Sequence, residues 1–80
     1  MNLLKLKMAT PEYVEYYYYP DGEGTPGEVR LDISNLAVSV LIRATNDNTA
    51  EHYGYKAAKA LKQCVEETNN LPLEFINAWY

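Results

Sequence analysis

The fold is decided by residues 12–43, which read EYVEYYYYPDGEGTPGEVRLDISNLAVSVLIR. Residues 12–19 are rich in tyrosine and valine, the residue types that favour β-strands. Successive side chains of a strand point to opposite faces of the sheet. One face therefore carries Val14, Tyr16 and Tyr18, and the other carries Tyr13, Glu15, Tyr17 and Tyr19. The four consecutive tyrosines cannot all enter one core, so some of these rings must lie on the second face.

A loop and a hairpin follow this strand. Residues 20–27 are rich in glycine and proline and predict a loop. Residues 28–33 and 36–43 each alternate apolar with polar side chains, which is typical of strands with one buried face. A turn at Ser34-Asn35 pairs Ile33 with Leu36, Leu31 with Val38, and Val29 with Val40, so that every apolar residue falls on one face.

The two ends of the chain add further strands and one helix. Leu4, Leu6 and Met8 alternate with Lys5 and Lys7, which predicts a short edge strand. Residues 48–51, which begin with Asn48, have the capping chemistry of a helix start, and apolar residues then recur at spacings of three and four over residues 50–68. Asn69-Asn70 can end this helix, Pro72 prevents its continuation, and residues 75–80 predict a last strand.

These elements predict a single α+β domain over residues 1–80, because a chain of this length has room for one core. We expect a mostly antiparallel sheet of four to five strands, with one amphipathic helix packed on one face.

Charge and cysteine content narrow the class of function. Seven basic and eleven acidic side chains give a net charge of −4, which repels phosphate backbones and argues against nucleic-acid binding. Cys64 is the single cysteine, so no internal disulfide can form, which fits a reducing cytoplasm. Lys5 and Lys7 interrupt the opening apolar run, unlike a signal peptide, and no stretch approaches the roughly twenty apolar residues of a membrane span.

Three motifs suggest chemistry, and a structural explanation is favoured for each. Gly22-x-Gly24-x-x-Gly27 has the spacing of a dinucleotide fingerprint, but acidic neighbours and a following strand favour a hairpin loop. The acidic residues of this loop lack the full ligand pattern of a calcium site. His52 and Cys64 lie about 18 Å apart along one predicted helix, too far for a catalytic dyad. We therefore predict no catalytic residue, no metal site and no cofactor.

The tyrosines of the second sheet face are the candidate functional residues. Tyr13, Tyr17 and Tyr19 could form a recognition surface, which Tyr55 and Trp79 could extend, because tyrosine offers a large rigid area. The alternative is a cross-strand aromatic ladder that stabilises the sheet.

The combined features predict a cytoplasmic, non-enzymatic protein-interaction module with an unidentified protein partner. We also expect a homodimer that uses the tyrosine face or an edge strand. An antitoxin-like domain, or a ligand-binding domain whose site forms in an oligomer, is the alternative.

The Tyr-rich strand, the segment Pro20-Asp21-Gly22-Glu23-Gly24-Thr25-Pro26-Gly27-Glu28, an Ala-rich helix with Tyr53 and a terminal Ala78-Trp79-Tyr80 resemble a group of small bacterial proteins of uncharacterised role. The resemblance covers residues 16–80 and implies a bacterial or phage origin but no activity. At the level of the fold, the chain is similar to antitoxins of toxin–antitoxin pairs, whose core is three strands followed by an amphipathic helix. Their usual Gly-Cys segment before the helix is missing here.

Overall fold

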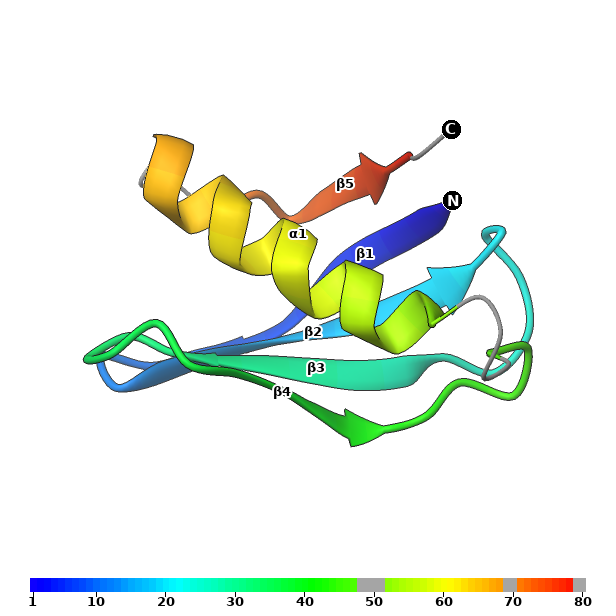
Figure 1. Ribbon diagram of the computed structural model, residues 1–80, viewed down its shortest axis with the longest axis horizontal. Coiled ribbons are helices and arrows are strands. Elements are labelled where there is room, and N and C mark those ends of the chain that lie inside the picture. The colour runs from blue at the N-terminus through cyan, green and yellow to red at the C-terminus, as the bar shows by residue number, and fades with distance from the viewer. Residues whose placement is uncertain (48–51, 69–70, 79–80) are drawn as a thin grey trace.

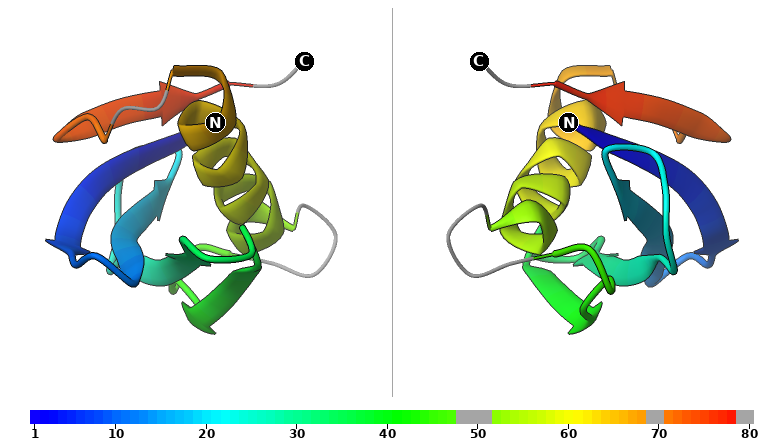
Figure 2. Two further views of the ribbon diagram at one scale, coloured as in Figure 1. Left: turned by 90° about the vertical axis from the view of Figure 1, so that its left-hand side faces the viewer. Right: turned by 90° about the vertical axis from the view of Figure 1, so that its right-hand side faces the viewer.

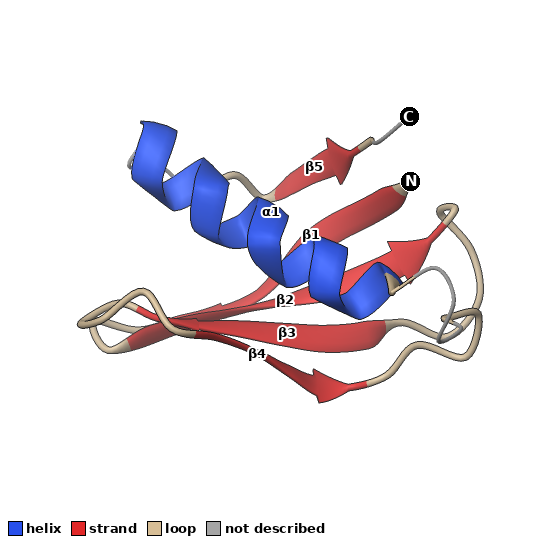
Figure 3. Ribbon diagram, viewed as in Figure 1, coloured by secondary structure: helices blue, strands red, loops and turns tan. Residues whose placement is uncertain are grey.

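A computed structural model describes residues 1–47, 52–68 and 71–78. The elements in chain order are β1 (Asn2–Ala9), β2 (Tyr13–Pro20), β3 (Gly27–Asp32), β4 (Val38–Ile42), α1 (Tyr53–Thr68) and β5 (Glu74–Asn77). The five strands form one sheet in the order β4-β3-β2-β1-β5, and each neighbouring pair is antiparallel (Figure 1). The predicted α+β class and the single helix are confirmed (Figure 3).

The sheet curves around α1, which packs on its concave face (Figure 2). Side chains from both layers form the core, and its fully buried members include Leu4, Val14, Tyr16, Tyr18, Val29, Leu31, Ala57 and Leu61. In the part of the chain that the structure describes, no helix has the length and apolarity needed to cross a membrane.

β2 has the two different faces that its sequence predicts. Val14, Tyr16 and Tyr18 are fully buried beneath α1, whereas the tyrosines of the other face, Tyr13, Tyr17 and Tyr19, are half-buried. The two buried hydroxyls have partners, because Tyr16 donates to the Pro72 carbonyl at 2.6 Å and Tyr18 donates to Asp47 Oδ2 at 2.7 Å. Loss of hydration on burial raises the pKa of each of these two phenols to about 12.

β1 is an inner strand, so the prediction of an edge strand at residues 4–8 is wrong. Its neighbours are β2 and β5, and the edges of the sheet are β4 and β5. The reason is that β5 returns from the end of α1 and pairs with the outer side of β1. Within β5, the Phe75 ring packs edge-on against Tyr16, with the ring centroids 5.6 Å apart. The predicted strand at 75–80 is therefore confirmed through Asn77, and Trp79 and Tyr80 lie outside the described residues.

The register of the β3–β4 hairpin is confirmed, but its turn is longer than predicted. Leu31 pairs with Val38 and Val29 pairs with Val40. The connection is a loop over residues 33–37, closed by a hydrogen bond from Asp32 N–H to the Ala37 carbonyl at 2.9 Å. The predicted Ile33–Leu36 pair is wrong, because Leu36 has a φ of 56° and the Ile33 N–H donates to the Glu12 carbonyl instead.

A register shift near the end of β4 also changes one prediction. Val29 pairs with Val40, but Glu28 pairs with Ile42, so one extra residue is accommodated on β4. This β-bulge places Ile42 on the face of Glu28 rather than on that of Val29. The apolar residues of the hairpin therefore do not all share one face.

α1 begins at Tyr53, and its first amide groups are bound by an upstream carboxylate. Asp47 accepts hydrogen bonds from the N–H groups of Tyr53 and Gly54, each at 3.0 Å. The predicted cap at residues 48–51 and the stop at Asn69-Asn70 lie outside the described residues. His52 has a φ of 53° and precedes the helix, so its predicted place on the helix is wrong.

Candidate functional site

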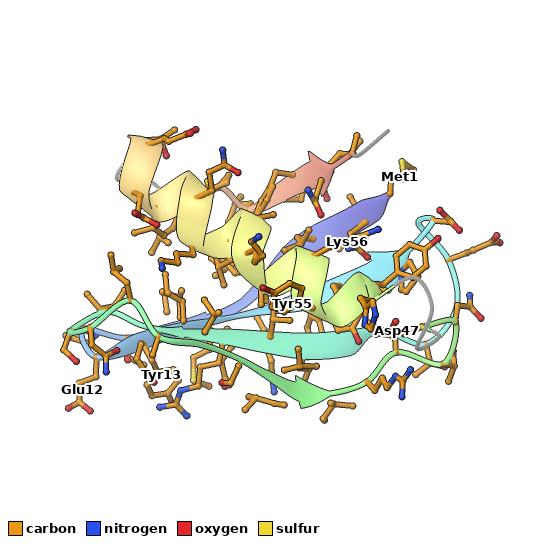
Figure 4. All side chains as sticks on the ribbon, in the orientation of Figure 1. Met1, Glu12, Tyr13, Asp47, Tyr55 and Lys56 are labelled. Carbon is orange, nitrogen blue, oxygen red and sulfur yellow. The ribbon has the colours of Figure 1, made fainter. Side chains whose placement is uncertain are left out.

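The side of the sheet away from α1 carries the predicted tyrosine site, and we call it the open face. Tyr13, Tyr17 and Tyr19 all lie on it, and Figure 4 shows Tyr13 on the opposite side of the sheet from Tyr55. Tyr55 belongs to α1 and does not extend this surface. Trp79 lies outside the described residues. The structure thus brings the three tyrosines of β2 onto one face.

Each ring of the open face is accompanied by a cation from a neighbouring strand. The Arg30 guanidinium lies 3.7 Å from the Tyr13 ring centroid. The ammonium groups of Lys7 and Lys5 lie 5.7 Å and 5.4 Å from the rings of Tyr17 and Tyr19. Cation–π contacts of this kind are attractive and hold the cation over the ring. The open face is therefore a layer of tyrosines and cations rather than a bare aromatic surface.

Carboxylates complete this layer. Lys7 forms an ion pair with Glu28 at 2.5 Å, and this hydrogen bond raises the pKa of the Lys7 ammonium. Glu15 is only 8% exposed and faces Arg30 across the ladder, so the two opposite charges share one position of the sheet. Arg30 also donates to Asp32 at 3.2 Å. Two of the three cations of the open face, Lys7 and Arg30, are thus paired with carboxylates of the chain itself.

Exposed apolar side chains gather instead on β4, at one edge of the sheet. Val40, Leu41 and Ile42 are 42%, 46% and 51% exposed, and residues 38–42 carry no charge. The sequence carries a signal for this surface, because the consecutive apolar residues Val40, Leu41 and Ile42 cannot all face one core if they lie in a strand.

The backbone of β4 offers unpaired groups along the same edge. The bond from Asp32 N–H to the Ala37 carbonyl makes these residues a hydrogen-bonded pair, and hydrogen-bonded pairs alternate along an antiparallel ladder. Ser39, opposite Arg30, therefore directs its N–H and C=O toward β3. Val38 and Val40 direct theirs outward, away from the sheet.

A shallow groove of about 420 Å³ lies beside this edge, between β4 and α1. It is lined by Val38, Tyr55, Lys59, Lys62, Gln63 and Glu66. Tyr55 is 59% exposed, and the Lys59 ammonium lies 5.4 Å from its ring centroid. We call Val38–Ile42 together with this groove the β4 edge surface; it combines apolar area, free strand backbone and flanking charges of both signs.

Two carboxylates, the buried Asp47 and the exposed Asp21, have structural partners. The side chain of Asp47 is 5% exposed and accepts from the Tyr18 hydroxyl in addition to binding the start of α1. Asp21 accepts from the N-terminal ammonium at 3.2 Å and from the Tyr53 hydroxyl at 3.0 Å, and these two bonds lower the pKa of Asp21. Both carboxylates therefore join distant segments of the chain.

The glycine loop has the geometry of a tight connection. Gly22 and Gly24 adopt φ values of 80° and 85°, which glycine tolerates best, and the loop leads into β3 rather than into a helix. A phosphate site of the dinucleotide type uses a helix N-terminus at this point. Across residues 1–47, 52–68 and 71–78, no group of three or more His, Cys, Asp or Glu side chains is placed to hold a metal ion.

Comparison of the chain with protein-family models, with curated proteins and with solved structures gives no match.

Proposed function

We propose that the protein is a non-enzymatic interaction domain that binds a protein partner by strand addition at β4. The observation that carries this proposal is the outward backbone of Val38 and Val40 on an uncharged, apolar edge strand. An extended segment laid along β4 gains main-chain hydrogen bonds there, and its side chains meet the exposed apolar residues. Natural edges without such a role are usually protected by charge or proline.

The opposite edge of the sheet is less suited to this role. β5 has four residues, carries Glu74, and follows Pro72. The Leu6 N–H donates to the Leu73 carbonyl, so these two residues form a hydrogen-bonded pair between β1 and β5. Because such pairs alternate along an antiparallel ladder, Ile76, which lies opposite Leu3, directs its N–H and C=O outward. β5 thus supplies a matched control position for β4 rather than an equal candidate.

The non-enzymatic part of the proposal is supported by how the buried carboxylates are used. Asp47 binds α1 and Tyr18, and Glu28 and Asp32 are paired with Lys7 and Arg30. The open face as a second contact surface, through Tyr13, Tyr17 and Tyr19, stays a prediction.

A displayed library of extended peptides, selected against the purified protein, tests the proposal. We expect selected peptides to slow amide hydrogen exchange at Val38 and Val40, because these N–H groups become hydrogen-bonded. Val40→Pro removes one outward N–H and should abolish binding, whereas Ile76→Pro makes the same change on β5 and should leave binding intact. Peptides that protect other amides and bind Val40→Pro unchanged would refute strand addition at β4.

A further inference from the structure

We infer that the segment that pairs with β4 is the β4 strand of a second copy of this chain. The two strands run antiparallel about a twofold axis at Ser39, so that one sheet continues through both copies. This inference rests on the proposed strand addition and names its partner.

The backbone pattern of β4 is self-complementary about Ser39. With Ser39 opposite Ser39 of the second copy, each Val38 faces a Val40, and both pairs are hydrogen-bonded because these residues direct their backbone outward. A twofold axis at Val40 would set Val38 against Ile42. Because Ile42 pairs with Glu28, its N–H and C=O point toward β3 and are not available to a second copy. A twofold axis at Val40 would therefore form fewer hydrogen bonds between the two copies than an axis at Ser39. The backbone directions of Val38, Ser39 and Val40 thus favour the register in which Ser39 lies opposite Ser39 of the second copy.

The side chains fit the same register. Val38 and Val40 lie on the helix side of the sheet, since they pair with the buried residues Leu31 and Val29. Each valine therefore meets a valine of the second copy, and cross-strand pairs of β-branched residues are favourable. Ser39 is exposed on the open face, where two small polar side chains meet without crowding. No pair of like charges is created within residues 38–42.

The groove beside β4 extends the fit to α1. α1 lies over β3 and β4 near this edge (Figures 1 and 2). Strands are spaced by about 4.8 Å, so two helices related by the axis would be about 10–14 Å apart. Closely packed helices lie at 8–10 Å, and the long side chains of the groove bridge the difference. The groove also carries Lys59, Lys62 and Glu66, so charges of both signs lie beside β4.

The contact is small, because it consists of one short strand and one groove on each copy. Interfaces below about 1,200 Å² belong to the weak and transient class. We therefore expect micromolar association, with monomer and dimer in exchange.

Cysteine trapping tests the register directly. In a Cys64→Ala background, Ser39→Cys places a single thiol at the axis. Directly opposite residues of a non-hydrogen-bonded pair have Cα atoms about 4.5 Å apart, within the range that a disulfide spans. We expect Ser39→Cys to form a covalent dimer on mild oxidation, and the exposed loop variant Ser34→Cys in the same background to stay largely monomeric.

Sedimentation equilibrium across the micromolar range provides the second measurement. The wild-type mass should rise to that of a dimer, Val40→Pro should stay monomeric, and Ile76→Pro should dimerise like the wild type. A monomeric mass at high micromolar concentration, without Ser39→Cys trapping, overturns the self-pairing. So does a dimer that Ser39→Cys fails to trap.

The failure of self-pairing and the failure of strand addition give different results. If the chain is monomeric but library peptides protect the amides of Val38 and Val40, the self-pairing falls and strand addition stands. If neither self-association nor any peptide protects these amides, both fall.

Discussion

Replacement of Asp47 by alanine should destabilise the protein by about 1.5–5 kcal/mol. The Asp47 carboxylate accepts from the amides of Tyr53 and Gly54 and from the Tyr18 hydroxyl. Loss of a helix cap costs about 0.5–2 kcal/mol. Tyr18 is fully buried, so its hydroxyl would lose its acceptor without access to water, which costs about 1–3 kcal/mol more. A domain of this size is stable by only about 4–12 kcal/mol, so the loss is a large fraction of the total.

Urea unfolding followed by circular dichroism measures this effect, provided that the slope of the transition is unchanged. Asp32→Ala is the matched control, because that carboxylate is half-exposed and its pair with Arg30 should contribute less than about 1 kcal/mol.

A double-mutant cycle with Tyr18→Phe isolates the buried hydrogen bond. Tyr18→Phe also leaves the Ala44 N–H without its acceptor, but this cost appears in both arms of the cycle and cancels. In the Tyr18→Phe background, Asp47→Ala should cost only the cap. An equal cost in both backgrounds, or a loss below about 0.5 kcal/mol in the wild type, would refute the reasoning.

Three further predictions follow from the core. Burial raises the pKa of Tyr16 and Tyr18 to about 12, above the ordinary value of 10.0, because the folded protein favours the neutral phenol. The contribution of each phenol to the free energy of unfolding is therefore complete below pH 10 and is lost as the pH rises toward 12. Unfolding measured against pH should show this loss, about 2–3 kcal/mol for each phenol, and Tyr16→Phe should make the dependence shallower. Gly27→Ala should destabilise by about 1–3 kcal/mol, because the new methyl group would overlap the Tyr18 ring; an unchanged midpoint would contradict this packing. Leu31→Asp should abolish folding, as judged by circular dichroism, whereas the Arg30→Ala variant should fold. The reverse result would mean that the Arg30 face of β3, and not the Leu31 face, lies in the core.

The sequence alone determines the features that depend on residues close together in the chain. The period of two places Tyr16 and Tyr18 on the face opposite Tyr17, because a strand alternates whatever it packs against. The facing of Leu31 and Val38 follows in the same way, since a slip of one residue would put the two apolar rows on opposite faces. The three- and four-residue spacing of apolar side chains likewise predicts α1.

The tertiary structure alone decides the features that join distant segments. β1 becomes an inner strand only because β5, from the other end of the chain, pairs with it. α1 begins where Asp47 meets its amides, and a carboxylate that is six residues upstream of Tyr53 falls outside the local capping pattern. The cations over the tyrosines come from neighbouring strands, and the bulge on β4 exposes Leu41 and Ile42 at an edge. Strand order, ion pairing and edge exposure are set by long-range contacts, and local periodicity carries no information about them.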